Sequence, residues 1–218
     1  MVLNCRTPGD AEDARTRIAH QGGSASIACF DVTDPQAVRE SVAEIEREGP
    51  IDILVNNAGI QRRGALHEFD DDDWRELMAT NIDAVYYMGK AVARGMIDRG
   101  RGKIINIASV QSELARPKIA PYTAAKGAVR NLTRGMCADW AQYGIQANAL
   151  APGYFDTPLN AALVNDPDFD SWLKARTPAG RWGNLSDLHG AAIFLASPAS
   201  DFVNGQTIYV DGGITTVI

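Results

Sequence analysis

The sequence predicts an α/β protein built on a doubly wound parallel sheet. Short apolar segments alternate with longer amphipathic segments along the chain, which is typical of parallel strands joined by crossover helices. Two of the short segments, 51–55 and 104–107, are almost continuously apolar, as expected for strands that helices bury on both faces. We therefore expect strands at 2–4, 26–30, 51–55, 103–108, 146–150 and 206–210.

Helices are expected in the amphipathic segments. Asp34 precedes Pro35, so a capping side chain stands directly before a proline suited to the first helical turn. The aspartates from Asp70 to Asp73 precede another amphipathic segment, and we interpret them as a solvated helix start rather than a metal site, because the helix dipole favours carboxylates there. No repeat or linker divides the chain, so we expect one domain over residues 1–218. The expected helices are 10–21, 35–48, 71–99, 121–143 and 186–196, with shorter helical pieces within 158–176.

Composition excludes several classes of protein. The 27 acidic residues outnumber the 21 basic ones, and no cluster of lysines and arginines forms a basic face, which disfavours nucleic-acid binding. The three cysteines, Cys5, Cys29 and Cys137, are widely spaced without a CxxC pair, which indicates reduced thiols rather than a disulfide framework or a zinc site. The first ten residues lack the apolar core of a signal peptide, and no apolar stretch reaches membrane-spanning length. We expect a cytoplasmic protein without a metal, a nucleic-acid partner or a membrane anchor.

Three residues have the chemistry of a proton-transfer site. Tyr122 and Lys126 stand four residues apart and share a helix face, and Ser109 lies thirteen residues before the tyrosine, at the end of an apolar strand. Both Ser109 and Tyr122 should therefore face the crevice at the carboxyl end of that strand. A nearby ammonium group should lower the pKa of the tyrosine toward the working pH of a general acid/base. The alternative is a surface tyrosine packed along a lysine stem; the serine favours the catalytic interpretation.

Two upstream features accompany this set. The turn at 56–59, which contains Asn56 and Gly59, follows an apolar strand; asparagine and glycine tolerate the left-handed backbone of a sharp exit, and Gly59 lets the backbone approach a ligand. An ordinary turn would use the same residues. Asn81 lies inside the expected helix 71–99, where asparagine is a poor helix former. It either opens the helix locally to hold a water molecule or is a tolerated polar residue.

Together these motifs resemble the short-chain dehydrogenase/reductase family. The resemblance extends from Val2 to the carboxyl end and implies a Rossmann-like fold and an NAD(P)-dependent oxidoreductase. It implies that Tyr122 is the acid/base, that Ser109 binds the reacting oxygen, that Lys126 tunes the tyrosine and binds the nicotinamide ribose, and that Asn81 anchors a relay water.

The resemblance also implies the residues that touch the cofactor. Arg6 ends the strand that reaches the adenine ribose, where an arginine can pair with a 2′-phosphate, so we expect NADP to be preferred, with NAD as the alternative. The other implied contacts are Asp31, Val32, Asn57, Ala58, Gly59, Tyr122, Lys126, Pro152, Gly153, Phe155 and Thr157.

Within the family, the substrate-side loops at 58–63, 109–117, 151–155 and 176–183 most resemble those of gluconate 5-dehydrogenases. This implies interconversion of D-gluconate and 5-ketogluconate. A small polyhydroxy acid needs a cation for its carboxylate and several polar groups for its hydroxyls. The candidate residues are Arg62, Arg63, Ser109, Gln111, Glu113 and Arg116, each of which is otherwise an ordinary solvated loop residue.

The sequence also fits two alternative functions. A 3-oxoacyl-thioester reductase would share the catalytic residues, and a non-catalytic homologue would only associate with full-length subunits. The long helices 71–99 and 121–143 carry more apolar side chains than one sheet-facing stripe requires, and with the family resemblance this implies a homotetramer in the full-length form.

The amino end departs from the family pattern. That pattern begins with a strand, a Thr-Gly-x-x-x-Gly-x-Gly turn and a helix, and none of these precedes Val2. We therefore expect an incomplete sheet whose first βα unit is absent, with unpaired edges on the strands at 2–4 and 51–55. A fragment, a late start assignment and a shortened inactive protein would each explain the departure. On this interpretation, residues 1–50 should be poorly ordered and the 218-residue chain should lack useful dehydrogenase activity.

Overall fold

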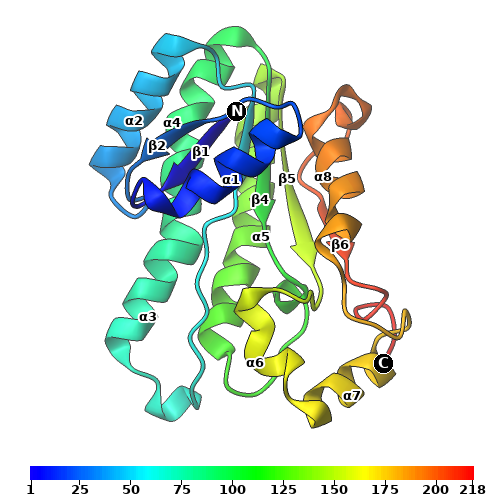
Figure 1. Ribbon diagram of the computed structural model, residues 1–218. Helices are drawn as coiled ribbons and strands as arrows, with labels where there is room; N and C mark the ends of the chain where they lie inside the picture. The colour runs from blue at the N-terminus through cyan, green and yellow to red at the C-terminus, as the bar shows by residue number, and fades with distance from the viewer.

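The computed structural model describes residues 1–218 and contains two parallel sheets (Figure 1). All six predicted strands are confirmed, with boundaries that differ by no more than two residues. Strands β1 (Val2–Cys5) and β2 (Ser26–Cys29) form the smaller sheet. The larger sheet has the order β3-β4-β5-β6, with β3 at Ile53–Asn56, β4 at Gly102–Ile107, β5 at Ile145–Pro152 and β6 at Thr207–Val210.

The interruption between the two sheets lies between β1 and β3, where the sequence predicts unpaired edges. β1 pairs only with β2, and β3 pairs only with β4. On β3, Leu54 and Asn56 are buried, whereas the side chains of Ile53 and Val55 are about half exposed. The expectation that segment 51–55 is buried on both faces is therefore wrong for one face, which no helix covers.

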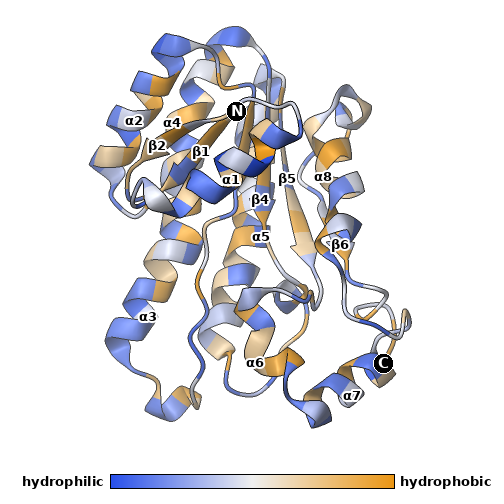
Figure 2. Ribbon diagram, viewed as in Figure 1, coloured by the Kyte–Doolittle hydropathy of each residue, from blue (hydrophilic) through white to orange (hydrophobic).

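Helices pack on both faces of the larger sheet at β4 and β5, which confirms the doubly wound α/β prediction (Figure 2). Adjacent residues of a strand point to opposite faces, and Ile104 and Ile105 of β4 are both buried. Ile104 packs in the main core with residues of α4 (Ala84–Arg99) and α5 (Ala120–Trp140). Ile105 packs in a smaller core with Leu195 of α8 (His189–Ala196).

The predicted helix 71–99 is interrupted by a different helical form. α3 (Asp71–Met78) and α4 are joined by a π-helical segment, Ala79–Asp83, that contains Asn81. Single π-helical turns inside α-helices are rare and frequent at functional sites. The remaining predicted helices are confirmed as α1 (Gly9–His20), α2 (Pro35–Glu48), α5, α6 (Ala161–Val164), α7 (Pro167–Arg176) and α8, the last preceded by a 3₁₀ turn at Leu185–Leu188.

Both predicted helix starts are capped as expected. The Asp34 carboxylate accepts hydrogen bonds from the first backbone amides of α2, and the Asp70 carboxylate does the same for α3. No helix is long and apolar enough to cross a membrane.

Residues 1–50, expected to be poorly ordered, form a regular β1–α1–β2–α2 unit. The reason lies in α2, which buries Val38 and Val42 in the main core and packs against α4. Burial of these apolar side chains stabilises the unit, although one edge of β1 has no paired strand.

We predict that Gly144→Ala destabilises the fold. Gly144 has a φ of +75°, and a Cβ there would overlap the Gly100 carbonyl oxygen. The substitution should lower the free energy of unfolding by about 2 kcal/mol, because it combines a left-handed backbone with a clash against main chain. Gly135 lies exposed in α5 with open space around it, so Gly135→Ala should instead be neutral or stabilising by up to about 1 kcal/mol. Urea unfolding would measure both; equal stability of the two variants would contradict the prediction.

Candidate active site

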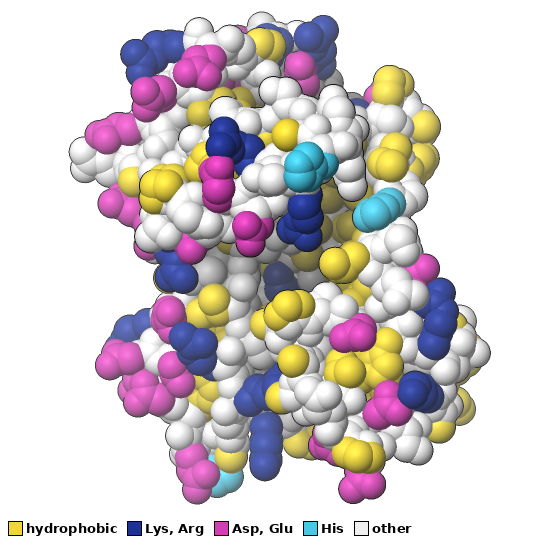
Figure 3. Space-filling model, in the orientation of Figure 1, with side chains coloured by type: hydrophobic (Ala, Val, Ile, Leu, Met, Phe, Trp, Pro, Cys, Tyr) yellow, Lys and Arg dark blue, Asp and Glu magenta, His cyan; other side chains and the backbone are white.

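A hollow crosses the middle of the molecule, below α1 and above α6 in the view of Figure 3. Two adjoining pockets occupy it. The inner pocket is lined by residues that follow β4 and β5 and by the start of α5. The outer pocket is lined by residues at the ends of β1 and β2. Gly59 and Ile60 line both pockets, so the turn after β3 forms their common wall.

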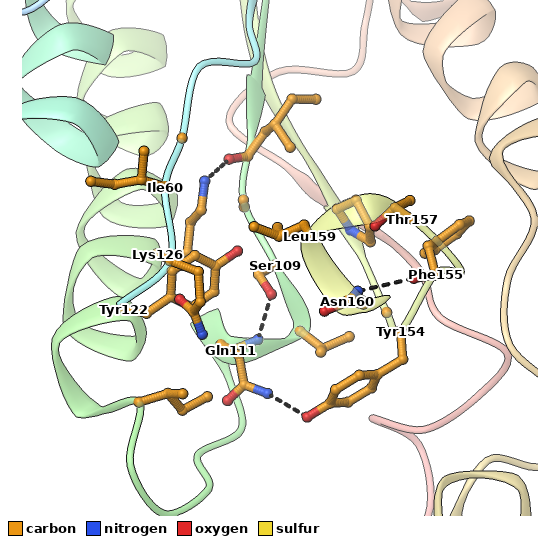
Figure 4. Close-up of a pocket in the computed structure, with 18 of the residues that line it drawn as sticks. Ile60, Ser109, Gln111, Tyr122, Lys126, Tyr154, Phe155, Thr157, Leu159 and Asn160 are labelled. Atoms are coloured by element: carbon orange, nitrogen blue, oxygen red, sulfur yellow. Dashed lines mark hydrogen bonds between the residues drawn. The ribbon is translucent and has the colours of Figure 1, made fainter. Parts of the chain in front are cut away.

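The three predicted catalytic residues meet in the inner pocket (Figure 4). Ser109 follows β4 and is buried. Its hydroxyl oxygen accepts a hydrogen bond from the backbone amide of Gln111 and so caps the 3₁₀ turn at Val110–Ser112. Tyr122 lies in the first turn of α5, with Lys126 one turn later. The Lys126 amine lies 5.7 Å from the centre of the Tyr122 ring. The sequence spacing therefore brings the hydroxyl, the phenol and the amine into one cavity, as predicted.

The electrostatics of the pair differ from the sequence expectation. Burial lowers the pKa of Lys126 to about 8, and its amine donates a 2.6 Å hydrogen bond to the Ile107 carbonyl oxygen. Burial raises the pKa of Tyr122, while a hydrogen bond with Ser109 opposes that rise. The predicted lowering of the tyrosine pKa by the ammonium is wrong for this structure, because the amine points to the end of β4 and burial of the phenol dominates.

Asn81 holds the wall between the pockets. Its side chain is fully buried; the amide nitrogen donates to the Ile60 carbonyl oxygen at 2.9 Å, and its oxygen accepts from the Ile60 amide at 2.8 Å. Both ends of the side chain thus bind the backbone after the 56–59 turn. Gly59 lies beside it: a Cβ there would be 3.4 Å from the Asn81 side-chain oxygen and 3.8 Å from the Lys126 amine. The Asn81 side chain is thus buried, and both of its polar atoms are hydrogen-bonded.

Every residue predicted to touch the cofactor lines one of the two pockets. In the outer pocket, the Asp31 carboxylate accepts hydrogen bonds from the Thr33 amide and hydroxyl, which lower the pKa of Asp31, and the Arg6 charge lowers it further. The outer pocket also holds Val32, Ala58 and Gly59. The inner pocket holds Asn57, Gly59, Tyr122, Lys126, Pro152, Gly153, Phe155 and Thr157.

The predicted substrate residues separate into two groups. Arg63, Ser109, Gln111 and Arg116 line the inner pocket, whereas Arg62 and Glu113 do not. The Arg62 guanidinium is paired with the carboxylates of α3 at 2.6 and 3.2 Å, and Glu113 forms an ion pair with an arginine of α5. Arg63 has no such compensation: burial, and then the neighbouring Arg116 charge, lower its pKa. Two adjacent cations in a pocket favour an anionic ligand.

The sequence did not predict every residue of the inner pocket, and Gln61 and Tyr154 are two polar residues among those it missed. Gln61 and Tyr154 both line the inner pocket, and the side-chain amide nitrogen of Gln111 donates a hydrogen bond to the Tyr154 hydroxyl at 3.3 Å. Both lie in loop segments that carry the family resemblance, 58–63 and 151–155, but sequence does not show which side chains of a loop point inward.

Several polar atoms of this pocket are buried without a hydrogen-bond partner. They are the side-chain oxygens of Gln61 and Gln111 and the Arg116 Nε. Buried polar atoms in proteins are nearly always paired, so unpaired ones that line a pocket point to a polar ligand. The pocket therefore offers acceptors, donors and positive charge next to Ser109 and Tyr122.

Comparison with known proteins decides the family. Residues 2–215 match the family model described as "Enoyl-(Acyl carrier protein) reductase", a branch of the short-chain dehydrogenases/reductases. The chain belongs to the short-chain dehydrogenase/reductase family. This confirms the family predicted from the catalytic motifs.

Relatives within the family act on sugar acids. The chain is 61% identical to gluconate 5-dehydrogenase of Gluconobacter oxydans (strain 621H), over 99% of this chain and 84% of that protein. It is 49% identical to 5-keto-D-gluconate 5-reductase of Escherichia coli (strain K12), over 100% of this chain and 86% of the relative. The crystal structure of a gluconate 5-dehydrogenase from Burkholderia cenocepacia J2315 in complex with NADP and tartrate superposes with a TM-score of 0.97 at 62% identity, covering 100% of this chain and 86% of that one. The predicted resemblance to gluconate 5-dehydrogenases is confirmed.

We predict that the free energy of unfolding of this short-chain dehydrogenase, measured without cofactor, depends on pH because Lys126 is buried. The pKa of Lys126 is about 8 in the folded protein against an ordinary 10.5, so between these values the unfolded chain holds a proton that the folded chain has lost. Stability should therefore rise with pH from about 8 to 10.5, with Lys126 contributing up to roughly 3 kcal/mol. Urea unfolding of the protein and of Lys126→Met across this range would measure the difference. The same pH dependence in both proteins would show that Lys126 is not the group responsible.

Proposed function

We propose that this protein, in a form that carries the glycine turn of the family, catalyses the NADP-dependent interconversion of D-gluconate and 5-ketogluconate. The observation that carries the proposal is the composition of the inner pocket. One cavity combines Ser109, Tyr122 and Lys126 with two uncompensated arginines and with unpaired amide oxygens. A polyhydroxy acid presents the matching carboxylate and hydroxyls. The relatives whose names state activity on gluconate and 5-ketogluconate support the same substrate class.

The residues of the chain fit the nicotinamide end and the adenosine end of a dinucleotide, one in each pocket. The two pockets adjoin at Gly59 and Ile60, which line both of them. Lys126 and Tyr122 would hold the nicotinamide ribose, and the residues after β5 would hold the carboxamide. Arg6 in the outer pocket would pair with a 2′-phosphate, which favours NADP over NAD. Comparable kcat/KM values with both cofactors would contradict that preference. When bound, the nicotinamide accepts the hydride from C5 of gluconate or returns it to the ketone.

The proton is handled by the chain itself. In oxidation, the Tyr122 phenolate accepts the proton of the C5 hydroxyl while Ser109 hydrogen-bonds the reacting oxygen; in reduction, the phenol returns the proton to that oxygen. The Lys126 amine, with its pKa of about 8, changes charge near the operating pH. It can therefore protonate when the phenolate forms and compensate that charge in a buried site.

The substrate class separates this proposal from the alternative of a 3-oxoacyl-thioester reductase. An acyl chain would need an apolar channel, whereas the inner pocket adds Arg63, Arg116 and two glutamines to its partly apolar lining, which favours a charged, hydroxylated substrate. The Arg116 guanidinium is held 5.6 Å above the Phe169 ring, which orients it at the pocket wall. Arg63 and Arg116 are therefore proposed to bind the gluconate carboxylate.

The proposed setting is a homotetramer in the cytoplasm. Apolar side chains on outer helix faces support the assembly: Ile193 of α8 is 67% exposed and Tyr86 of α4 is 43% exposed. The free cysteines are consistent with a reducing compartment. A monomer by light scattering at micromolar concentration would count against the tetramer.

The acid/base role predicts that Tyr122→Phe lowers kcat by at least about 100-fold, because the ring remains while the transferable proton is lost. The dissociation constant for NADPH should stay within about twofold, as measured by calorimetry. Tyr143→Phe, which changes an exposed tyrosine that lines neither pocket, is the matched control and should keep full turnover. Substantial turnover by Tyr122→Phe would remove this residue from its proposed role.

The carboxylate site is tested with three arginine variants. Arg63→Met and Arg116→Met should each raise the KM for D-gluconate roughly tenfold, because each removes a charge-assisted contact, while the KM for NADP stays unchanged. Arg62→Met removes an adjacent arginine that the carboxylates of α3 neutralise, so its KM for gluconate should change less than about twofold. An effect of Arg62→Met as large as that of the other two would place the carboxylate elsewhere.

A further inference from the structure

Two thiols that are distant in the sequence meet beside the outer pocket. Cys5 ends β1 and Cys29 ends β2, and they are direct partners in the parallel register of the two strands. Their Sγ atoms lie 3.1 Å apart, and both cysteines are free. The cysteines are widely spaced in the sequence, but two of them are neighbours in the fold.

The geometry allows these thiols to become a disulfide. Neighbouring strands lie about 4.8 Å apart, and disulfides span Cα separations of about 4.4–6.8 Å. The sulfurs would have to approach by only about 1 Å to reach a covalent bond length near 2.05 Å. Side-chain rotation within the pair supplies a movement of this size, so β1 and β2 need not separate.

An oxidant can reach the pair. Cys29 is exposed and Cys5 is half-buried. The hydrogen bond between the two sulfurs, together with burial and the charge of Cys29, raises the pKa of Cys5 to about 11. Cys5 therefore keeps its proton at neutral pH, and Cys29 is the sulfur open to attack a reagent from solvent.

The pair lies where oxidation would alter a binding surface. Cys5 itself lines the outer pocket and precedes Arg6. Cys29 precedes Phe30 and Asp31, which line the same pocket. The Asn4 side chain bonds to the Ala28 and Phe30 carbonyl oxygens across these strand ends. A covalent link here would therefore move the Cys5 side chain in the lining of the outer pocket and fix the two strand exits that carry Arg6 and Asp31.

We propose that Cys5 and Cys29 form a reversible oxidation site for low-molecular-weight disulfides, and that the resulting protein disulfide weakens nucleotide binding in the outer pocket. The Cys29 thiolate attacks one sulfur of the reagent and releases one thiolate. The Cys5 thiol then loses its proton and attacks the Cys29 sulfur, releasing the second thiol. The two cysteines are oxidised by two electrons, and the reagent is reduced to two thiols. An exposed disulfide of this kind is easily reduced again.

The oxidation site is tested by thiol mapping on the full chain. Oxidised glutathione should reduce the number of free thiols by two, with a mass loss of two hydrogens and a cross-linked peptide pair containing Cys5 and Cys29; dithiothreitol should reverse the change. Cys137→Ser should behave like the parent protein, whereas Cys5→Ser should stop at a glutathione adduct on Cys29. Stable glutathione adducts on the parent protein, or no reaction at Cys29, would overturn the proposal.

The effect on the nucleotide rests on the proposed function and has its own measurement. Oxidation should raise the dissociation constant for NADPH roughly fivefold or more, and dithiothreitol should restore it, while the Cys5→Ser and Cys29→Ser variants should show no disulfide-dependent change. An unchanged dissociation constant in the cross-linked protein would overturn the effect on binding. If the reduced protein binds no NADPH, the proposed function fails, while the mass data still decide the oxidation site.

Discussion

The hydrogen bond from the Lys126 amine to the Ile107 carbonyl oxygen joins the first turns of α5 to the end of β4. It is one of several contacts across that junction. The Ser112 hydroxyl donates to the Lys126 carbonyl oxygen, and deeper in the core the Asn106 amide donates to the Thr133 hydroxyl. Because these groups are buried, each must keep its partner, so the helix cannot slide along the strand without large cost. The relative positions of Ser109 and Tyr122 follow from this junction.

The wall between the two pockets depends on a second constraint. The π-helical segment between α3 and α4 places the buried Asn81 so that it pairs with both backbone groups of Ile60. This contact fixes the turn after β3, which faces the inner pocket on one side and the outer pocket on the other. A helix with regular α geometry throughout 71–99 would present Asn81 at a different angle. The π segment thus has a clear structural role beside the site.

Charge pairing separates the arginines near the inner pocket into two groups. Arg62 and Arg130 are neutralised by carboxylates, whereas Arg63 and Arg116 line a pocket that has unpaired polar atoms. The fold alone does not decide between acyl and sugar-acid substrates, since the catalytic residues would be the same. The lining of the inner pocket makes that distinction.

The sequence by itself determined the order of strands and helices, the two helix caps and the catalytic spacing, because each depends on local patterns of polarity or on residues within one turn. It also placed the interruption between β1 and β3. Only the tertiary structure decided which loop arginines face the pocket, that burial rather than Lys126 controls the pKa of Tyr122, and that Cys5 meets Cys29. These features depend on side-chain direction, depth and strand register, which link residues far apart in the chain. Local sequence carries no direct signal for such distances.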